Sequence, residues 1–513
     1  IALVYDLHLD ANGDKLLAFA APTGSAPAKV VRDPTATENA WRDLLKPGAI
    51  SVPDKRVTDA YYASLAYILM SNDGGVLHPG PLLHDAFWYR DSTYELSALE
   101  RNGNLAQVRQ LLEPLVRFQE ANGEFPANVS THPQVGHPRG APEWDSQGQG
   151  IHSLVEYYRF SHDTAWLRSV APNIYQAATW LQALADTDRS GLLPPGESAE
   201  DLGPATDRHF WDDFWGVIGL RDAAFVADAL DQGTRVPGAP IQANLLSAQA
   251  ENLLVATLAA GQPGLQRENG IFPNSPDSRE TPADARGTSP AVWPGQLLSA
   301  DQARTWFSGY YERFVVPYGG AFRHEDNNFW PFGGLEIAHA SLYAGLPDQT
   351  NAILVWQLDH VTGKGVWAWG DEVSQDASQL IGGDMPHDWV AAEYVDLVRD
   401  MLVYESGGSY QSAGALQLAA GVPASWIPDG APGVAVKSLP TYFGAISYQL
   451  VRAGSTITLD LQMQTPPPAG YDLRLPFELA DVSIDGAAPS AARSQPVHLP
   501  PTAKHVVAHL KPA

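Results

Sequence analysis

Cysteine is absent from this sequence of 513 residues, which excludes disulfide bonds, thiolate metal sites and cysteine nucleophiles. Several other catalytic signatures are also missing: the GxSxG turn of serine hydrolases, the phosphate-binding P-loop, the HExxH zinc motif and a glycine-rich dinucleotide fingerprint. The sequence therefore gives no sign of a cofactor, and we expect none.

Basic residues are scarce, with 32 Lys and Arg against 58 Asp and Glu, so the formal net charge is −26. Nucleic-acid binding rewards clusters of Lys and Arg, and because these are missing, the charge argues against nucleic acid and we expect no such partner. No apolar run is long enough to span a membrane. A hydrophobic share of 44% with 18% charged residues is typical of a soluble globular protein. The expected partner is a small neutral or cationic molecule, and the sequence identifies no protein partner.

The two ends of the chain show β patterns. Residues 1–21 alternate apolar and polar side chains around a turn at 11–14, which predicts a hairpin at the tail of an N-terminal β domain. Because the sequence starts at Ile1, without Met or a signal-like segment, we expect it to be trimmed or processed. After about residue 430, short alternating segments such as 444–451 and 455–463 predict a small β-sandwich.

Between these ends, from about residue 51 to 420, the sequence repeats one helical pattern. An amphipathic helix ends in a turn that contains Gly or Asp, and a second helix follows at once, as in 98–107, 159–166, 227–236 and 341–350. This pattern is typical of αα-hairpins. Long loops rich in Gly, Pro, Trp and Asp separate the hairpins, and long loops in a compact domain usually carry function. These loops cover residues 123–147, 190–212, 268–298, 318–333 and 363–388.

About six such hairpins would close into a barrel, in which an outer ring of helices surrounds an inner ring and the long loops crowd one mouth. The predicted fold class is therefore mainly α: an (α/α)6 barrel with a β segment at the N-terminus and a small C-terminal β-sandwich. The corresponding domains are residues 1–40 for the β segment and linker, 41–425 for the barrel and 426–513 for the sandwich.

Two of the loops set carboxylates among tryptophans: HFWDDFW at 209–215 and VWAWGDE at 366–372. Indole rings stack on the apolar faces of sugar rings. A carboxyl group held against them loses solvation, so its pKa rises toward the range of a proton donor. Two such carboxyls on opposite sides of a pocket would break a glycosidic bond, so a small carbohydrate is the expected substrate.

The order of the elements and several short motifs resemble the six-hairpin glycosidases, a superfamily that contains glucoamylases, trehalase-like glucosidases and α-L-rhamnosidases. Residues 87–91 (FWYRD) are similar to its W-x-R-D element, and 143–148 (EWDSQG) to its Q-x-D-x-x-G element. Residues 209–212 (HFWD) stand in the place of the general-acid loop. The segment 370–372 (GDE), followed by PHDW at 386–389, resembles the segment that supplies the general base. The resemblance implies a glucoside-type enzyme that inverts the anomeric centre and attacks a non-reducing end.

An inverting glycosidase needs a protonated carboxyl at the leaving oxygen and an ionised carboxylate that holds water on the opposite face, about 6.5 to 9.5 Å away. Asp212 is the expected acid, because neighbouring aromatic residues such as Trp211 desolvate it and Asp213 adds like charge. The resemblance makes Glu372 the base. Asp213 and Asp371 are the alternates for these two roles. The alternative is that Asp212 and Asp213 simply cap a helix and that Glu372 is a solvated loop residue.

Further residues are expected to bind the sugar, because they belong to the motifs or lie in loops flanked by Gly or Pro. They are Trp88, Arg90, Asp91, Trp144, Asp145, Trp211, Glu325, Trp330, Trp367, Trp369 and His387. The alternative for the tryptophans is packing beneath the loops, and for Glu325 or the Arg90–Asp91 pair it is a solvated charged surface. Histidines such as His84 and His387 have no metal-ligand spacing, so they are interpreted as hydrogen-bonding residues and no metal site is predicted.

Three other functions stay open from the sequence. The upstream β segment and the terminal β-sandwich also occur in α-L-rhamnosidases, whose pocket needs an apolar patch for the methyl group of rhamnose. A disaccharide phosphorylase would need a cationic phosphate pocket and no base carboxylate. A catalytically inactive, carbohydrate-binding barrel would hold Asp212 and Glu372 far apart or pointing away from each other.

Overall fold

The computed structural model describes residues 34–131, 142–197, 199, 203–234, 239–277, 287–323, 328–407, 414–492 and 495–512. The chain divides into two compact units, Ile1–Lys46 and Pro47–Ala513. In the first unit, α1 (Pro34–Leu45) starts with proline, which suits the first turn of a helix because its missing N–H would have no partner there. The hairpin predicted for residues 1–21 lies outside the described residues.

The second unit is built mainly from helices, as the sequence predicts. α2 (Lys55–Met70) begins just after residues 51–54 (SVPD), where Asp54 caps the helix by accepting a hydrogen bond from the backbone N–H of Arg56 at 3.1 Å. The other helices are α3 (Tyr89–Asn102), α4 (Leu105–Leu111), α5 (Glu113–Arg117), α6 (Asp145–Ser161), α7 (Thr164–Ala185), α8 (Phe210–Thr234), α9 (Ala239–Arg267), α10 (Ser289–Val292), α11 (Ala300–Tyr310), η2 (Tyr311–Val315), η3 (Val316–Tyr318), α12 (Pro331–Tyr343), α13 (Pro347–His360), α14 (Asp388–Leu402) and η5 (Ala424–Trp426).

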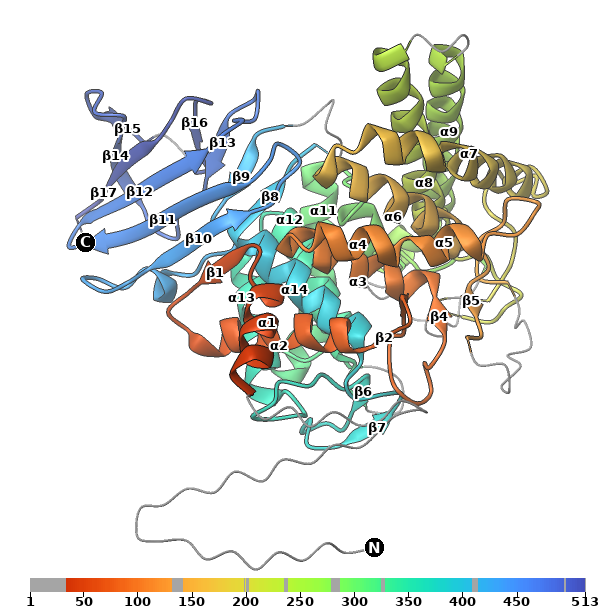
Figure 1. Cartoon of the computed structure of the whole chain (residues 1–513), viewed down its shortest axis with the longest axis horizontal. Coiled ribbons are helices and arrows are strands. Elements are labelled where there is room, and N and C mark those ends of the chain that lie inside the picture. The colour runs from red at the N-terminus through yellow and green to blue at the C-terminus, as the bar shows by residue number, and fades with distance from the viewer. Residues whose placement is uncertain are drawn as a thin grey trace, which may run out of the picture. The chain divides into compact units, whose positions relative to one another are not determined.

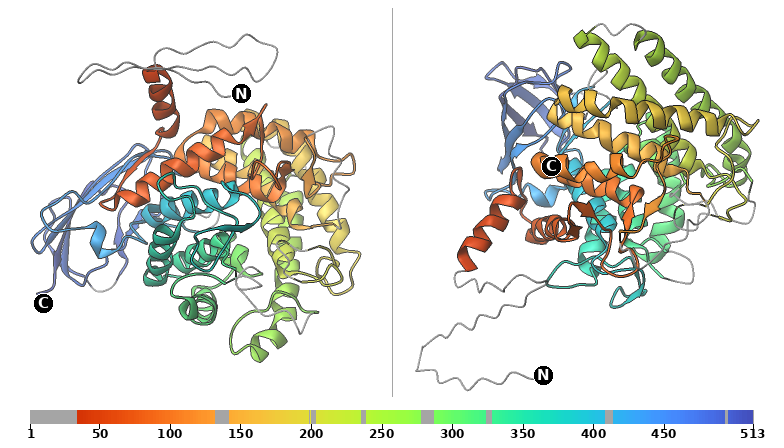
Figure 2. Two further views of the ribbon diagram at one scale, coloured as in Figure 1. Left: turned by 90° about the horizontal axis from the view of Figure 1, so that it is seen from below. Right: turned by 45° about the vertical axis from the view of Figure 1, so that its right-hand side comes forward.

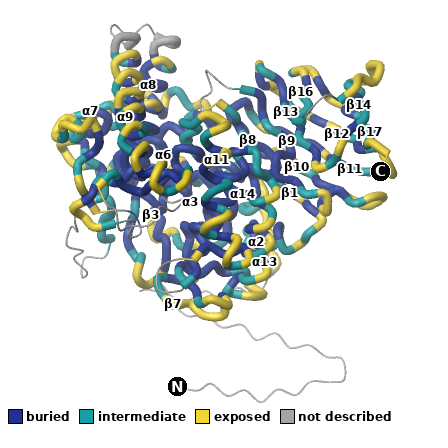
Figure 3. The backbone as a smooth tube through the Cα atoms, turned by 180° about the vertical axis from the view of Figure 1, so that it is seen from behind, coloured by how far each residue is buried: buried dark blue, intermediate teal, exposed yellow. Residues whose placement is uncertain are grey.

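Six of these helices contact one another in a circle: α3 packs on α6, α6 on α8, α8 on α10, α10 on α12, α12 on α14, and α14 again on α3. A second set, which includes α2, α7, α9, α11 and α13, packs against members of this circle (Figures 1 and 2). Every residue of α3 and α14 is buried, whereas α2 and α7 bury one face (Figure 3). This difference distinguishes an inner from an outer layer of helices.

The inner helices α6 and α8 approach each other so closely that only glycine fits between them. A Cβ atom on Gly148 would lie 1.9 Å from the carbonyl oxygen of Trp215. A Cβ atom on Gly219 would lie 2.7 Å from the Cα of Gly148. Because glycine has no side chain, the two backbones can meet at this point. The glycine of the EWDSQG motif therefore serves helix packing in this chain.

Two larger sheets are formed mostly by strands near the C-terminus. These strands are β1 (Ala49–Ser51), β8 (Val403–Glu405), β9 (Leu416–Leu418), β10 (Val434–Leu439), β11 (Ile446–Ala453), β12 (Thr456–Met463), β13 (Tyr471–Leu473), β14 (Leu479–Ile484), β15 (Ser490–Ala491), β16 (Val497–Leu499) and β17 (His505–Leu510). The first sheet has the order β1-β10-β11-β12-β17-β14-β15 with antiparallel neighbours, and the second has the order β16-β13-β9-β8, with β13 and β9 parallel.

The first sheet buries alternate residues, as the sequence pattern predicts for a strand with one covered face. In β11, Ile446, Tyr448 and Leu450 are buried, and the hydroxyl of Tyr448 donates to the carbonyl oxygen of Leu402 at the end of α14 at 3.0 Å. β1, which precedes α2 in the chain, pairs with β10 and so adds an N-terminal segment to this sheet. The predicted boundaries at residues 40 and 425 stay predictions.

Three short two-stranded sheets lie in the loops around the inner helices. They are β2 (Asn72–Asp73) with β3 (Val76–Leu77), β4 (Phe87–Trp88) with β5 (Asn128–Val129), and β6 (Glu372–Val373) with β7 (Leu380–Gly382). Among the helices of the described residues, none combines the length and the apolar composition that crossing a membrane requires.

Candidate active site

The described site residues that the motifs predict lie where the inner helices begin. Arg90 and Asp91 are in the first turn of α3, Asp145 opens α6, Trp211 and Asp212 are in the first turn of α8, Trp330 precedes α12, and His387 precedes α14. Each of these helices is preceded by one of the long loops or by the short β4 strand. The site residues lie at these helix starts because the last residues of each loop lead directly into the first turn of the next inner helix.

Contacts around Asp145 join the starts of three inner helices. Its Oδ2 accepts a hydrogen bond from Nε of Arg90 at 2.7 Å and one from Nε1 of Trp211 at 2.9 Å. Arg90 also pairs with Glu143 and lies over the ring of Trp389 in α14, with 5.8 Å between Cζ and the ring centre. We call Arg90, Glu143, Asp145 and Trp211 the Asp145 cluster. It fixes the first turns of α3, α6 and α8 beside that of α14.

Asp212 stands next to this cluster and is 1% exposed. Within the described part of the chain, neither of its carboxylate oxygens has a hydrogen-bond partner. Burial raises the pKa of Asp212 well above its usual value, the charges of Asp145 and Asp213 act in the same direction, and Arg90 opposes them. A buried carboxyl without a partner destabilises the fold, and such groups concentrate at functional sites. Asp212 therefore holds a proton more readily than an ordinary aspartate, which suits it to donate one.

The alternate acid, Asp213, has a partner that Asp212 lacks. Its Oδ1 accepts a hydrogen bond from the backbone N–H of Leu193 at 2.8 Å, in the loop between α7 and α8. Burial raises the pKa of Asp213 to about 8, while the bond from Leu193 acts in the opposite direction. Asp213 thus ties the loop to the start of α8, and its carboxylate is already engaged by the protein.

The second pair of candidate carboxylates lies at β6. Oδ1 of Asp371 is 3.4 Å from Nε1 of Trp330, and the ring of Trp330 is 5.8 Å from that of Trp389, which also contacts the Asp145 cluster. Asp371 is buried, and its neighbour Glu372, the first residue of β6, is half-buried. The chain of contacts through the two tryptophans places these carboxylates at the same end of the inner helices as Asp212.

Two histidines lie beside Asp371. Its Oδ2 is 3.6 Å from Nε2 of His387 and 4.0 Å from Nδ1 of His84, and the two imidazole rings are 4.9 Å apart. Nδ1 of His84 is also 3.1 Å from Oδ2 of Asp384. His387 is 1% exposed, and neither of its ring nitrogens has a hydrogen-bond partner in the described residues. Burial, with a further contribution from His84, lowers the pKa of His387 well below its usual value.

Trp88 lies near these groups, and Asp91 follows it in the first turn of α3. The ring of Trp88 is half-buried and 6.0 Å from that of His84, and within the described residues its indole nitrogen is buried without a hydrogen-bond partner. Asp91 is buried in the first turn of α3. Glu325, in contrast, lies outside the described residues.

The three remaining predicted tryptophans have packing roles or lie at a turn. Nε1 of Trp144 donates to the carbonyl oxygen of Pro194 at 3.0 Å, and its ring contacts that of Trp180. Nε1 of Trp369 donates to Oγ of Ser64 in α2 at 3.0 Å. Trp367 is half-buried in a turn, with a positive φ of 56°. Their roles in sugar binding stay predictions.

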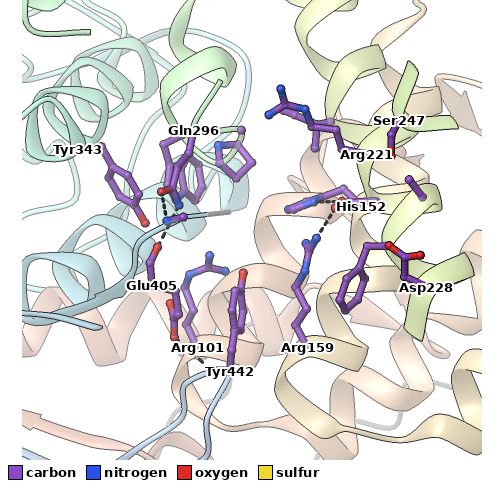
Figure 4. Close-up of a pocket in the computed structure, with 18 residues that line it drawn as sticks. Arg101, His152, Arg159, Arg221, Asp228, Ser247, Gln296, Tyr343, Glu405 and Tyr442 are labelled. Carbon is purple, nitrogen blue, oxygen red and sulfur yellow. Dashed lines mark hydrogen bonds and ion pairs between the residues drawn. The ribbon is translucent and has the colours of Figure 1, made fainter. Parts of the chain in front are cut away.

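A cavity of about 370 Å³ lies at the opposite ends of the inner helices (Figure 4). Its lining includes Arg101 near the end of α3, Arg159 near the end of α6 and Tyr442 from the loop before β11. Arg101 pairs with Glu156 and Arg159 with Asp222, so these cations are already neutralised by the protein. No residue predicted to be in the active site lines this cavity. It is therefore separate from the candidate site.

Sequence reasoning missed some of the residues that the fold brings to the site. Trp389 was visible only as part of the PHDW motif, although it contacts both Arg90 and Trp330. His84 and Asp384 are 300 residues apart in the chain, and no local spacing could have joined them. The one available signal was the placement of both residues in loops that precede inner helices.

No model of a known protein family matches this sequence, and no curated protein is significantly similar to it. Several solved structures share its fold. An α-L-rhamnosidase from Dictyoglumus thermophilum is 11% identical with a TM-score of 0.59, over 90% of this chain and 50% of that one. A glycosidase in complex with glucose is 15% identical with a TM-score of 0.52, over 68% of this chain and 97% of that one. A bacterial glucoamylase complexed with acarbose is 15% identical with a TM-score of 0.50, over 66% of this chain and 55% of that one.

At these identities the likeness concerns the fold. The chain shares the fold of these glycosidases, in agreement with the resemblance in element order on which the sequence prediction depends. It spans about half the length of the rhamnosidase and nearly the whole length of the glucose-bound glycosidase.

Proposed function

We propose that the protein is a glycoside hydrolase, in which the two layers of helices close into an (α/α)6 barrel and the two larger sheets pack as a β-sandwich. The observation that carries this proposal is Asp212: a buried carboxyl with a raised pKa, without a hydrogen-bond partner among the described residues, at the end of the inner helices that also holds Asp371 and Glu372. The fold likeness to glycosidases supports the same reaction class.

The reaction we propose is inversion at a non-reducing end. Asp212 donates its proton to the glycosidic oxygen as the bond from that oxygen to the anomeric carbon breaks. Water attacks the anomeric carbon from the opposite face and gives its proton to the carboxylate of Glu372. Solvent returns the proton from Glu372 to Asp212 before the next turnover. One water is consumed, and the products are a free sugar of inverted configuration and the leaving alcohol.

Glu372 is a better base than Asp371, because its half-buried side chain has access to water. Asp371 is confined by three neighbours, namely Trp330, His84 and His387. A base must hold a water molecule at the distance that an inverting reaction needs, so a carboxylate enclosed by protein groups is at a disadvantage.

Sugar contacts are proposed for the residues around these carboxylates. Trp88 offers a ring face and an unpartnered indole N–H, and Arg90 and Asp91 offer a donor and an acceptor. Trp211, Asp145, Trp330 and His387 complete the lining. Trp144 and Trp369 act by holding their loops, through their hydrogen bonds to Pro194 and Ser64.

The decisive experiment measures sugar release from a panel of nitrophenyl glycosides and disaccharides, with NMR detection of the product anomer. We expect wild type to release an inverted sugar, and both Asp212→Asn and Glu372→Gln to lose about 10²- to 10⁴-fold in kcat, the range typical of general acid or base removal. Asp213→Asn decides between the two adjacent aspartates, and we expect it to keep most of the activity.

Three results would contradict the proposal. Full activity of both Asp212→Asn and Glu372→Gln would remove the assigned acid and base. Sugar release that requires inorganic phosphate would indicate a phosphorylase. Binding of sugars without release from any glycoside would indicate an inactive carbohydrate-binding barrel.

An α-L-rhamnoside is the second candidate substrate. The likeness to the rhamnosidase extends over 90% of this chain, whereas the likeness to the glucose-bound glycosidase covers 68%. The part of the chain up to the end of α14 is less than 90% of its length, so the likeness to the rhamnosidase includes residues of the C-terminal β region. The panel therefore includes nitrophenyl α-L-rhamnoside beside the α- and β-glucosides. Turnover of the rhamnoside in preference to both glucosides would indicate that the protein is an α-L-rhamnosidase.

A further inference from the structure

His84, Asp371 and His387 form a cluster with the donor set of a metal site. One ligand atom from each residue can be chosen so that all three lie within 4.8 Å of one another. Two ligands on a tetrahedral zinc ion lie about 3.4 Å apart, because the bonds from zinc to nitrogen and oxygen are about 2.0 to 2.2 Å long. The measured 3.6 Å between Nε2 of His387 and Oδ2 of Asp371 is close to this separation.

The state of His387 is the independent observation that points to a ligand. The residue is 1% exposed, and both ring nitrogens are buried without a hydrogen-bond partner in the described part of the chain. A buried imidazole normally finds a partner, because an unsatisfied polar group costs about 1 to 3 kcal/mol. The nitrogen nearest to Asp371 is therefore an open position for a cation that would lie between the two side chains. An ion held by bonds of about 2.0 to 2.2 Å can reach both atoms, because they lie 3.6 Å apart.

The surroundings hold the three side chains in place. The carboxylate of Asp384, which accepts hydrogen bonds from the backbone N–H groups of Leu82, Leu83 and His84, lies 3.1 Å from Nδ1 of His84. A ligand histidine usually donates its other ring N–H to a carboxylate that orients it, so with Nδ1 directed to Asp384, Nε2 of His84 is the nitrogen left to bind the ion. Gly383, with a φ of +68°, leaves the space that the carboxylate of Asp371 fills, since a Cβ atom there would lie 1.8 Å from Oδ2.

We propose that His84, Asp371 and His387 bind one divalent transition-metal ion of the zinc class. Imidazole and carboxylate ligands suit zinc, cobalt and nickel better than calcium or magnesium, which prefer oxygen ligands alone. Three protein ligands leave a further coordination position open to water or to a hydroxyl group of a ligand. The ion would link the loop before β4 to the loop before α14. This inference does not depend on glycosidase activity, and with Asp371 bound to the ion, Glu372 is the carboxylate left to act as base.

The test measures metal binding by the full chain without any substrate. Protein stripped with a chelator and dialysed is titrated with Zn²⁺ by calorimetry, and Co²⁺ binding is followed by its visible absorption bands. We expect one strong Zn²⁺ equivalent per chain in wild type. His84→Ala, Asp371→Asn and His387→Ala are each expected to weaken binding by about 10-fold or more, at least as much as the loss of a residue that only orients a ligand.

The matched control is His505→Ala, because His505 is an exposed histidine that pairs with Asp460 in the first sheet and has no contact with the cluster. We expect it to bind Zn²⁺ as wild type does. Circular dichroism of the metal-free variants checks that each folds. If His387→Ala fails to fold, His84→Gln replaces it, because the side chain of His84 is 23% exposed and tolerates change better. A wild type without a strong Zn²⁺ equivalent overturns the proposal, and so does equal binding by the cluster variants and the control.

Discussion

Nε of Arg90 lies 2.7 Å from Oδ2 of Asp145, and both side chains are buried where α3 and α6 begin. The same guanidinium pairs with Glu143, so two carboxylates share one cation. Arg90 also opposes the rise in the pKa of Asp212. The ion pair therefore joins two inner helices and also sets the electrostatic environment of the proposed acid.

Replacing Arg90 by glutamine should destabilise the protein strongly. The change leaves the buried carboxylate of Asp145 without its ionic partner, and breaking a buried ion pair from one side costs about 3 to 5 kcal/mol. The free energy of unfolding, measured by urea denaturation, checks this. Arg117→Gln is the control, because Arg117 forms an exposed pair with Glu113 on α5, and such pairs contribute about 0.5 kcal/mol or less. Equal losses in the two variants would show that the Asp145 cluster contributes no more than a surface pair.

Asp213→Asn should change how stability depends on pH. The pKa of Asp213 is raised to about 8 in the folded protein, against about 3.9 for an unfolded aspartate. Between these values the folded state holds a proton that the unfolded state has lost. The free energy of unfolding therefore falls as pH rises through this window, by at most about 1.4 kcal/mol per pH unit from this group.

Asparagine does not titrate in this range. The free energy of unfolding of the variant, relative to that of wild type, should therefore rise from pH 5 to pH 7. Urea denaturation at pH 5, 6 and 7 measures the difference. Some pH dependence will remain in the variant, because burial also raises the pKa of Asp396 to about 8. Parallel pH profiles for wild type and variant would mean that Asp213 is ionised in the folded protein.

Gly383→Ala should lower the free energy of unfolding by more than the strain of its backbone conformation alone explains. Gly383 has a φ of +68°, and alanine in this region costs about 1 to 2 kcal/mol. The new Cβ would in addition lie 1.8 Å from Oδ2 of Asp371, so the carboxylate has to move. Gly454→Ala is the matched control, because Gly454 has a φ of +60° and nothing within 4 Å of the added atom.

We expect both glycine variants to lose stability and only Gly383→Ala to lose sugar release as well. Unfolding free energies and turnover of the best substrate in the panel are the two measurements. If Gly383→Ala matches Gly454→Ala in both, the position of Asp371 has no influence on the reaction.

Most of the fold could be predicted from local sequence patterns. The alternation in β11 and the starts of the inner helices depend on neighbours in the chain, so they could be predicted from spacing. The motif at Trp88 to Asp91 and the one at Asp145 mark two such helix starts, and the structure joins them through Arg90.

Long-range contacts could not be predicted from the sequence, because no periodicity encodes them. β1 pairs with β10 although almost the whole helical region separates them, and Trp369 is bonded to Ser64 from 305 residues away. The meeting of His84 with Asp371 and His387 is of the same kind. Chemistry that depends on such encounters has to be read from the fold.

The contact between the helices and the C-terminal β region gives a last prediction. The hydroxyl of Tyr442 donates to the carboxylate of Glu156 in α6, with oxygen distances of 2.7 and 2.8 Å, and Arg101 pairs with the same carboxylate. Tyr442→Phe removes a buried hydrogen bond to a charged group and should cost about 1.5 to 3 kcal/mol. Tyr67→Phe, which removes a hydroxyl bonded to the carbonyl oxygen of Val366 at a more exposed position, should cost about 0.5 kcal/mol or less. Urea denaturation compares the two. Because both variants lose one hydroxyl and keep the ring, a larger loss in Tyr442→Phe isolates the contribution of the buried charge, and equal losses would mean that Arg101 and Arg159 satisfy Glu156 without Tyr442.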